Sequence, residues 1–150
     1  MVAPPSWNDD GLEDFPRVEE FIDCCGHTRR FEVDLHIAET GYFLRAVEVR
    51  DAPGGYEFAA YAEDSPFLAL GRLRHRIARG IATRYLVLSD GTLRLGHDRA
   101  VGHIDYGGVV IDGEPIDFDA FVAILQGYEG WQFELRIVDP YEALWGDGSV

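Results

Sequence analysis

The stretch FEVDLHIAETGYFLRAVEVRDAPGGYEFAAYA, residues 31–62, decides the fold of this chain. Its start alternates with the period of two that is typical of a half-buried strand, with these apolar residues on one face: Phe31, Val33, Leu35 and Ile37. Turn sequences at 40–41 and 52–55 divide the stretch, so we expect strands at 31–37, 42–50 and 56–62. Consecutive strands joined by short turns predict an antiparallel meander.

A helix is predicted directly after the meander. Ser65 suits the N-cap and Pro66 the first helical position, and the pattern extends to between Arg79 and Ala82. The apolar residues share one arc of this helix, and arginines form a stripe on the opposite side: Arg72, Arg76 and Arg79. Arg74 falls among the apolar residues, so we expect its guanidinium to meet a carboxylate or to reach solvent.

The second half of the chain contains shorter strands and another helix. Strands are expected at 85–89, 92–96, 101–105 and 108–112, with Asp90-Gly91 and Asp112-Gly113 as turns. Asp117 is the expected N-cap of a helix with one apolar face: Phe118, Phe121, Val122, Leu125 and Tyr128. A last strand precedes Pro140, and its alternation predicts core-facing residues: Trp131, Phe133, Leu135 and Ile137.

These elements predict the α+β class, a mainly antiparallel sheet of about seven or eight strands with two helices packed on it. Prolines and acidic residues leave residues 1–20 with little periodicity, so we expect a flexible acidic N-terminal arm there. A single α+β domain with one core is expected at 21–140, followed by a C-terminal tail at 141–150.

The composition bears on partners and location. Against 27 acidic residues stand 13 arginines and no lysine, a formal charge of −14 that repels phosphate backbones and disfavours nucleic acid as a partner. We expect no membrane span and no disulfide framework, because no long apolar run is present and the two cysteines are adjacent. A cytoplasmic location is expected.

Cys24, Cys25 and His27 carry the ligand types that zinc prefers. Structural zinc sites combine two ligand pairs at suitable spacing, and no second pair accompanies this cluster. A pair of ordinary cysteines before the first strand of the meander is therefore the favoured interpretation. We expect no bound metal and no cofactor.

The sequence contains no nucleophile elbow, phosphate loop, dinucleotide fingerprint or zinc-protease motif. One group of residues is a candidate for acid–base or metal chemistry, because two histidines and two aspartates fall within nine residues: His97, Asp98, His103 and Asp105. Their spacing matches no known motif, and exposed turn and strand positions explain them as well.

The segment VVIDGEPIDFDAFVAILQGYEGWQFELRIVDP, residues 109–140, resembles the closing part of an uncharacterised bacterial domain family of unknown function. In that family an Ile-Asp-Gly turn is followed by a helix, then by Tyr-Glu-Gly-Trp-Gln-Phe and an alternating strand. The upstream stretch HTRRFEVDLHIAETG is similar as well, so the resemblance covers roughly residues 26–140. It implies a folded domain and no particular activity.

Two classes of function remain open. Size, charge and missing motifs favour a non-catalytic binding module, with a basic protein as the expected partner. The helical stripe of Arg72, Arg76 and Arg79 is the expected contact for an acidic patch or an anion. The alternative is an enzyme with a dispersed site around residues 97–105. The alternation favours Trp131 and Phe133 as core-facing residues; the alternative is that they form an exposed aromatic platform with Tyr128 for a ligand or a partner.

Overall fold

The predicted meander is present in the computed structural model, which describes residues 15–142. It consists of β2 (Thr28–Ala38), β3 (Gly41–Glu48) and β4 (Glu57–Ala62), and β1 (Val18–Ile22) extends it to an antiparallel sheet of order β1-β2-β3-β4. The register places Val33 beside Ala46 and Leu44 beside Ala60, so the small and large apolar residues of the inward face interlock. The alternation in residues 31–37 therefore identified the buried face correctly.

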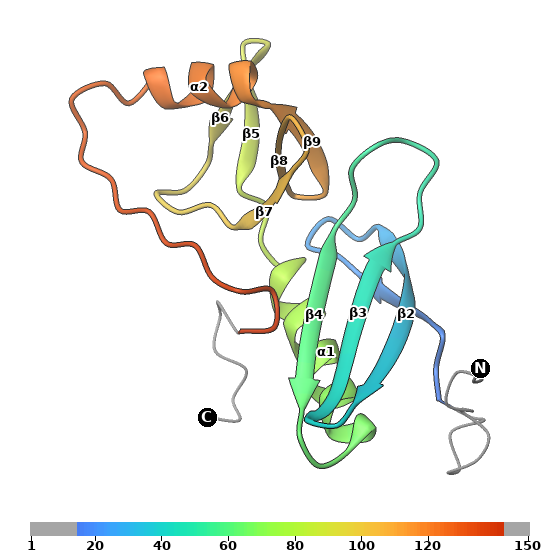
Figure 1. The fold of residues 1–150 in the computed structure, drawn as a ribbon. Coiled ribbons are helices and arrows are strands. Elements are labelled where there is room, and N and C mark those ends of the chain that lie inside the picture. The colour runs from blue at the N-terminus through green and yellow to red at the C-terminus, as the bar shows by residue number, and fades with distance from the viewer. Residues whose placement is uncertain (1–14, 143–150) are drawn as a thin grey trace.

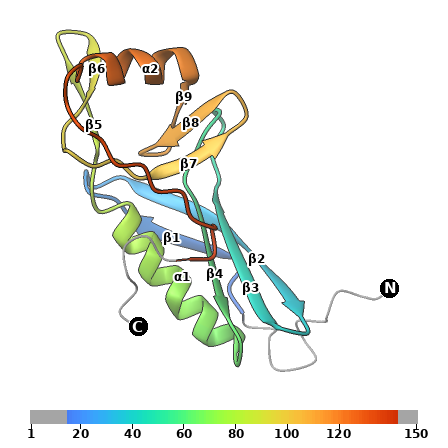
Figure 2. The same ribbon diagram turned by 60° about the vertical axis from the view of Figure 1, so that its left-hand side comes forward.

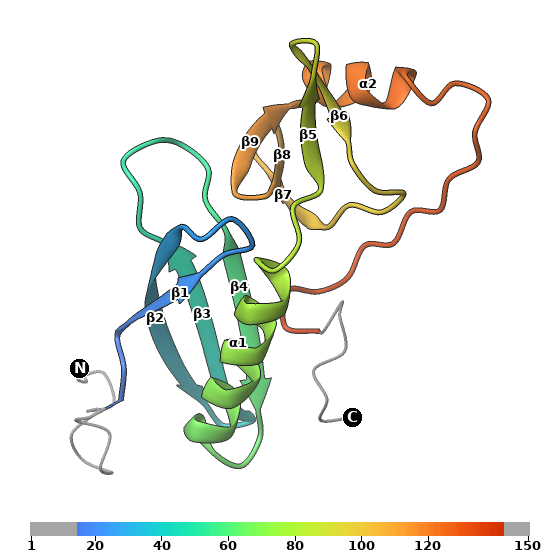
Figure 3. The ribbon, with the colours of Figure 1, turned by 180° about the vertical axis from the view of Figure 1, so that it is seen from behind.

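Helix α1 (Pro66–Gly80) covers this inward face (Figure 3). Its start is the predicted one, because the Ser65 hydroxyl accepts hydrogen bonds from the backbone N–H groups of Phe67 and Leu68. The core between sheet and helix is centred on side chains with almost no exposed surface: Phe31, Leu44, Leu73, Ile77 and Ile81. Burial of such side chains is worth roughly 1.5–3 kcal/mol each and holds the two layers together.

The ordered fold begins earlier than predicted, since residues 15–20 belong to it. Phe15 is buried and its ring packs edge-on against Phe67 at 5.4 Å between centroids, and Val18 starts strand β1. The sequence did not predict this strand because it lies at the edge of the sheet, where its two glutamates and the nearby proline interrupt the alternation of apolar and polar residues. The remainder of the expected arm, residues 1–14, lies outside the described residues.

Residues 85–142 form a second body, which we call the C-terminal unit, beside the N-terminal unit of residues 15–82 (Figure 1). Its elements are β5 (Leu86–Ser89) paired with β6 (Thr92–Leu95), a three-stranded sheet of β7 (Gly102–Asp105), β8 (Gly108–Ile111) and β9 (Glu114–Asp117), and helix α2 (Phe118–Gln126). Both predicted Asp-Gly turns are present, and Asp90 and Asp112 take the positive φ values, 53° and 58°, that such turns require. Asp117 caps α2 as expected.

The α+β class is confirmed, with two helices and antiparallel sheets in the described residues. Two details differ from the prediction: the strands form three sheets, with each helix on a different unit, and the buried side chains form two clusters in place of one core. A physical reason lies at the outer edge of β4, where the Arg76 and Arg72 guanidinium groups donate to the carbonyl oxygens of Ala59 and Tyr61. Those groups occupy acceptors that another strand would need.

The last predicted strand is wrong in this structure, because residues 131–139 form neither helix nor strand (Figures 1 and 3). The side chains expected in the core are exposed, by 72% for Trp131, 88% for Phe133, 74% for Leu135 and 69% for Ile137. Alternation shows that a segment suits a sheet, but it does not show that a neighbouring strand is available. Of the expected C-terminal tail, residues 143–150 lie outside the described residues.

The turn between β8 and β9 joins the two units (Figure 2). The buried Asp112 carboxylate accepts hydrogen bonds from the backbone N–H groups of Tyr85 at 3.0 Å and Leu86 at 2.8 Å, which fixes the start of β5. The carbonyl oxygen of the next residue, Gly113, accepts from the Gly55 N–H at 2.8 Å and from the Arg50 guanidinium at 2.7 Å. One turn therefore contacts both the C-terminal unit and the loop between β3 and β4.

We expect Asp112→Asn to destabilise the protein by about 1–3 kcal/mol in denaturant-induced unfolding. Asparagine tolerates the positive φ but has only one acceptor oxygen for the two N–H groups and no charge. Asp90→Asn is the matched control, since Asp90 occupies the same type of turn while exposed, and it should change stability by less than about 0.5 kcal/mol. Equal effects of the two substitutions would contradict the role of the Asp112 carboxylate.

Candidate functional site

The arginine stripe does not lie where the helical phase placed it. Arg76 is buried, and its Nη1 donates to the carbonyl oxygens of Ala59 at 2.8 Å and Tyr141 at 2.9 Å. Arg72 donates to Tyr61 O at 2.8 Å, and only Arg79 of the three has an exposed side chain on the helix surface. Two of the three predicted binding arginines therefore cover the edge of β4. The position of a residue around the helix does not predict this role, because the role depends on which strand lies next to the helix.

Arg74 behaves as predicted. Its guanidinium forms a two-pronged ion pair with the Glu19 carboxylate, at 2.6 and 2.7 Å, and this pairing raises the pKa of Arg74. The pair joins α1 to strand β1, so it explains part of the order that begins before residue 20.

The two cysteines lie in the turn before β2, with their Sγ atoms 3.6 Å apart. Asp23, Cys24 and Cys25 are the one group of three possible ligand residues that lies within 4.8 Å among residues 15–142. However, the Asp23 carboxylate already accepts from the N–H groups of Cys25 and His27 and from Arg29 Nε, at 2.8, 2.9 and 2.9 Å. Burial and the neighbouring Cys25 thiol raise the pKa of Cys24, which disfavours the thiolate that a metal needs. The expectation that no metal binds here stays a prediction.

A buried ionic network leads from this turn toward the C-terminal unit. Arg29 pairs with Asp23 and, through Nη1 at 3.0 Å, with Glu48, whose Oε1 accepts from the Tyr56 N–H at 3.1 Å. The Arg29 guanidinium also lies 5.4 Å from the centre of the Tyr56 ring. Burial raises the pKa of Tyr56. These contacts hold Tyr56 at the wall of a cavity.

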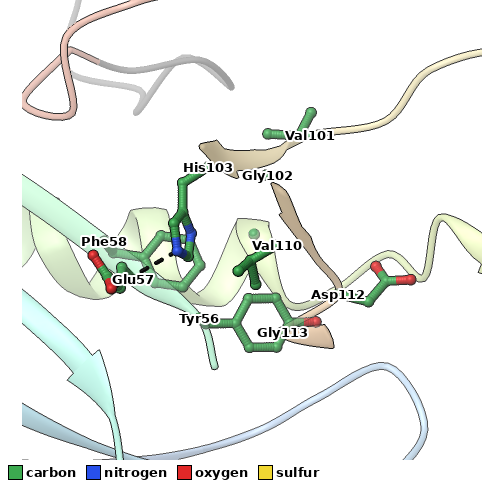
Figure 4. Close-up of a pocket in the computed structure, with 10 residues that line it drawn as sticks. Tyr56, Glu57, Phe58, Val101, Gly102, His103, Val110, Asp112 and Gly113 are labelled. Atoms are coloured by element: carbon green, nitrogen blue, oxygen red, sulfur yellow. Dashed lines mark ion pairs between the residues drawn. The ribbon is translucent and has the colours of Figure 1, made fainter. Parts of the chain in front are cut away.

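The cavity lies between the units and is small, about 40 Å³ (Figure 4). The N-terminal unit contributes Tyr56, Glu57, Phe58 and Gly80, and the C-terminal unit contributes Val101, Gly102, His103, Val110, Asp112 and Gly113. His103 Nε2 lies 3.7 Å from Glu57 Oε2 across it. Ligand sites occupy roughly 300–1,000 Å³, so the cavity has room for a few water molecules and not for a substrate.

The four residues of the enzyme hypothesis are spread over the C-terminal unit. His103 is at the cavity, His97 packs its ring edge-on against Tyr85 at 6.0 Å, Asp98 is exposed, and Asp105 is the last residue of β7. No three of them bring ligand atoms together within the part of the chain that is described. His103 pairs instead with Glu57, which is too distant in the sequence for residue spacing to predict the pair.

A larger groove, about 260 Å³, opens along the three-stranded sheet. Its lining includes four apolar residues, Val109, Val110, Pro115 and Ile116, and two acidic ones, Asp105 and Asp117. Tyr106, which also lines it, is fully exposed. Each aspartate uses Oδ1 locally, for the Tyr106 N–H at 2.8 Å and the Ala120 N–H at 2.7 Å. Within the part of the chain that is described, Oδ2 of each accepts no hydrogen bond.

Helix α2 begins at the border of this groove and presents apolar side chains to solvent. Phe118, Val122 and Leu125 follow the spacing of one helix face, and each is about half exposed, whereas Ile124 is buried against the sheet. The predicted apolar face of this helix is therefore only partly buried, since Phe121 and Tyr128 pack on the core and the other three point away from it. Neither helix of residues 15–142 has the length and apolarity needed to cross a membrane.

Comparison with known families divides the chain at the same place as the structure. Residues 13–82 match the model of a domain of unknown function (DUF7686), and residues 85–142 match that of a second domain of unknown function (DUF7713). The resemblance to an uncharacterised domain family is confirmed, in the form of two such models that together span almost the whole chain. No curated protein and no solved structure matches this chain.

Arg76→Lys should destabilise the protein by about 1–3 kcal/mol, because the lysine ammonium reaches one atom less far than Arg76 Nη1 and cannot donate to the Ala59 and Tyr141 carbonyls with the same geometry. Arg79→Lys is the matched control on the exposed face of the same helix, and we expect a change below about 0.5 kcal/mol. Chemical unfolding followed by circular dichroism measures both. A tolerant Arg76 with a sensitive Arg79 would show that the edge contacts are unimportant.

The Asp23 turn should be sensitive to acid. Burial opposes ionisation of Asp23, but the N–H groups of His27 and Cys25 and the Arg29 guanidinium outweigh it and hold the pKa below its ordinary value. The resulting stability is present above the ordinary pKa of about 3.9 and is lost as the pH falls through the lower folded pKa. We expect Asp23→Asn to lower the free energy of unfolding by about 1–3 kcal/mol at pH 7 and by progressively less as the pH falls below about 4. Urea unfolding of both proteins over this pH range measures the difference. A constant difference would contradict this.

Proposed function

We propose that the protein is a non-catalytic binding module whose acidic, partly apolar C-terminal unit binds the basic and apolar side chains of a protein partner. The observation that carries this proposal is the junction at Asp117-Phe118, where an acid-bordered groove continues into the exposed apolar face of α2. Apolar side chains exposed together and bordered by charge are typical of a surface that another macromolecule covers.

The charge distribution supports a basic partner for this unit. Residues 85–142 contain eleven acidic residues and three arginines, whereas residues 15–84 contain eleven acidic residues and ten arginines. The negative charge of the described chain is therefore concentrated on the unit that also exposes the apolar surface. Such a field accelerates encounter with a basic partner and weakens as salt is added.

The groove suits an arginine or lysine side chain of the partner. The apolar part of the groove lining suits the aliphatic stem of such a side chain, and Oδ2 of Asp105 and of Asp117, which has no hydrogen-bond partner among residues 15–142, suits its charged head. Apolar side chains of the partner would then lie against Phe118, Val122 and Leu125. We also place the protein in the cytoplasm, where its two free, exposed thiols stay reduced.

A second candidate is the enzyme with His103 at its centre, favoured by one observation, the His103–Glu57 pair at the cavity (Figure 4). A histidine beside a carboxylate is an arrangement for proton transfer near neutral pH. We rank this hypothesis second because the cavity is too small for a substrate, which could enter only if the two units separated.

Capture from a native lysate, with three versions of the full-length chain as bait, tests the binding proposal. Asp105→Asn combined with Asp117→Asn removes both groove charges while keeping the Oδ1 acceptors, including the helix cap. Asp51→Asn combined with Asp64→Asn makes the same change of charge on exposed loops of the N-terminal unit. We expect wild type and the loop variant to retain the same basic partner, and the groove variant to lose it by about tenfold or more.

Two results would contradict the proposal. One is a partner held equally by all three baits or insensitive to salt. The other is the recovery of no partner at low salt together with a turnover that His97→Ala or His103→Ala abolishes, which would establish the enzyme hypothesis in its place.

A further inference from the structure

Residues 131–139 have the sequence pattern of a strand but pair with no sheet of residues 15–142. The side chains alternate between apolar and polar, and the apolar ones are among the most exposed in residues 15–142: Trp131, Phe133, Leu135 and Ile137. Within the described residues, no backbone hydrogen bond joins residues 132–138 to another segment, and neither Glu134 nor Arg136 forms an ion pair. A segment of this kind offers both its backbone groups and its side chains to a partner strand.

The segment is held at both ends. At one end the Trp131 N–H donates to Tyr128 O at 2.9 Å, and the Trp131 ring packs edge-on against Tyr128 at 5.6 Å. At the other end Tyr141 packs against Phe43 at 5.2 Å, and its carbonyl accepts from Arg76. Fixed ends reduce the conformational freedom that pairing with another strand would remove. Figures 1 and 3 show the segment between them as one drawn-out arc away from the sheets.

The sheet nearest its anchored end is not a suitable partner. The outer carbonyls of β4 at Ala59 and Tyr61 are occupied by Arg76 and Arg72, so the segment cannot add there without displacing buried guanidinium groups. Its own sequence offers a better match. When two copies run antiparallel with Leu135 opposite Leu135, Phe133 faces Ile137 and Glu134 faces Arg136, and each pair occurs twice.

Other registers are worse. A shift by two positions places Glu134 opposite Glu134 or Arg136 opposite Arg136, which sets like charges face to face. A shift by one position sets the apolar residues of one copy opposite the polar residues of the other. The register centred on Leu135 is therefore self-complementary in shape and charge, as a two-fold symmetric contact requires.

We propose that two copies of this chain associate through antiparallel pairing of residues 133–137 about a two-fold axis at Leu135. This contact shares no residue with the groove or the α2 face, so the proposed dimer does not depend on the proposed function. The paired strands gather six apolar side chains on one face and two Glu134–Arg136 ion pairs on the other.

Sedimentation velocity of the purified full-length protein over a dilution series tests this. Wild type should show a concentration-dependent dimer. Glu134→Arg and Arg136→Glu should each weaken it by about tenfold or more, because attraction at two sites becomes repulsion. An equimolar mixture of the two variants should dimerise again, since each position then faces the opposite charge. Both side chains are exposed and form no ion pair with any described residue, so circular dichroism should show an unchanged fold.

Cross-linking checks the register. In a background of Cys24→Ser and Cys25→Ser, Leu135→Cys should form a disulfide-linked dimer on mild oxidation, because the two positions are directly opposite. Trp131→Cys is the control in the same segment, since two copies of position 131 would lie about 26 Å apart along the strands and should stay unlinked. A monomer at all concentrations, a dimer indifferent to both charge variants, or equal linking of the two cysteine variants would overturn the proposal. So would a monomer whose 132–138 amides resist hydrogen exchange, because the segment would then pair within its own chain.

Discussion

The turn at Asp112-Gly113 is the constraint on which the arrangement of this protein depends. Its carboxylate is buried and accepts hydrogen bonds from the N–H groups at the start of β5, and the carbonyl of the following residue accepts from Arg50 and Gly55. The approach is so close that a Cβ at Gly54 would lie 2.6 Å from Pro115 Cδ. Neither side of the turn can move without leaving a buried polar group unpaired, so the two units are held together by hydrogen bonds more than by a shared core.

Local patterns in the sequence were reliable where the neighbours of an element lie close in the chain. The meander, the Ser65 and Asp117 caps and both Asp-Gly turns depend on residues a few positions apart, and all are present. The burial of Arg76 and the exposure of Trp131 depend instead on whether a strand edge elsewhere in the chain is available to them. Periodicity reports which side chains share a face, but it does not report what lies opposite that face.

The candidate sites show the same division. The Arg74–Glu19 pair followed from a general rule, that a charge on an apolar face needs a partner, even though the identity of Glu19 did not. The groove, by contrast, is built by the order of three short strands, and Asp105 and Asp117 become neighbours only through the pairing of β8 with both β7 and β9. Sequence spacing grouped Asp105 with His97 and His103, but among residues 15–142 these candidates do not bring three ligand atoms together.

The attachment of Tyr141 to Arg76 and Phe43 has a mechanical consequence. The chain leaves the N-terminal unit after α1, builds the C-terminal unit and returns to the same helix, so both ends of that unit are fastened to one rigid support. A pull applied between Phe15 and Glu142 would therefore pass through the sheet and α1 and bypass the C-terminal unit until the Tyr141 contact broke. The strands that carry the groove would therefore bear force only after the contact between Tyr141 and Arg76 had broken.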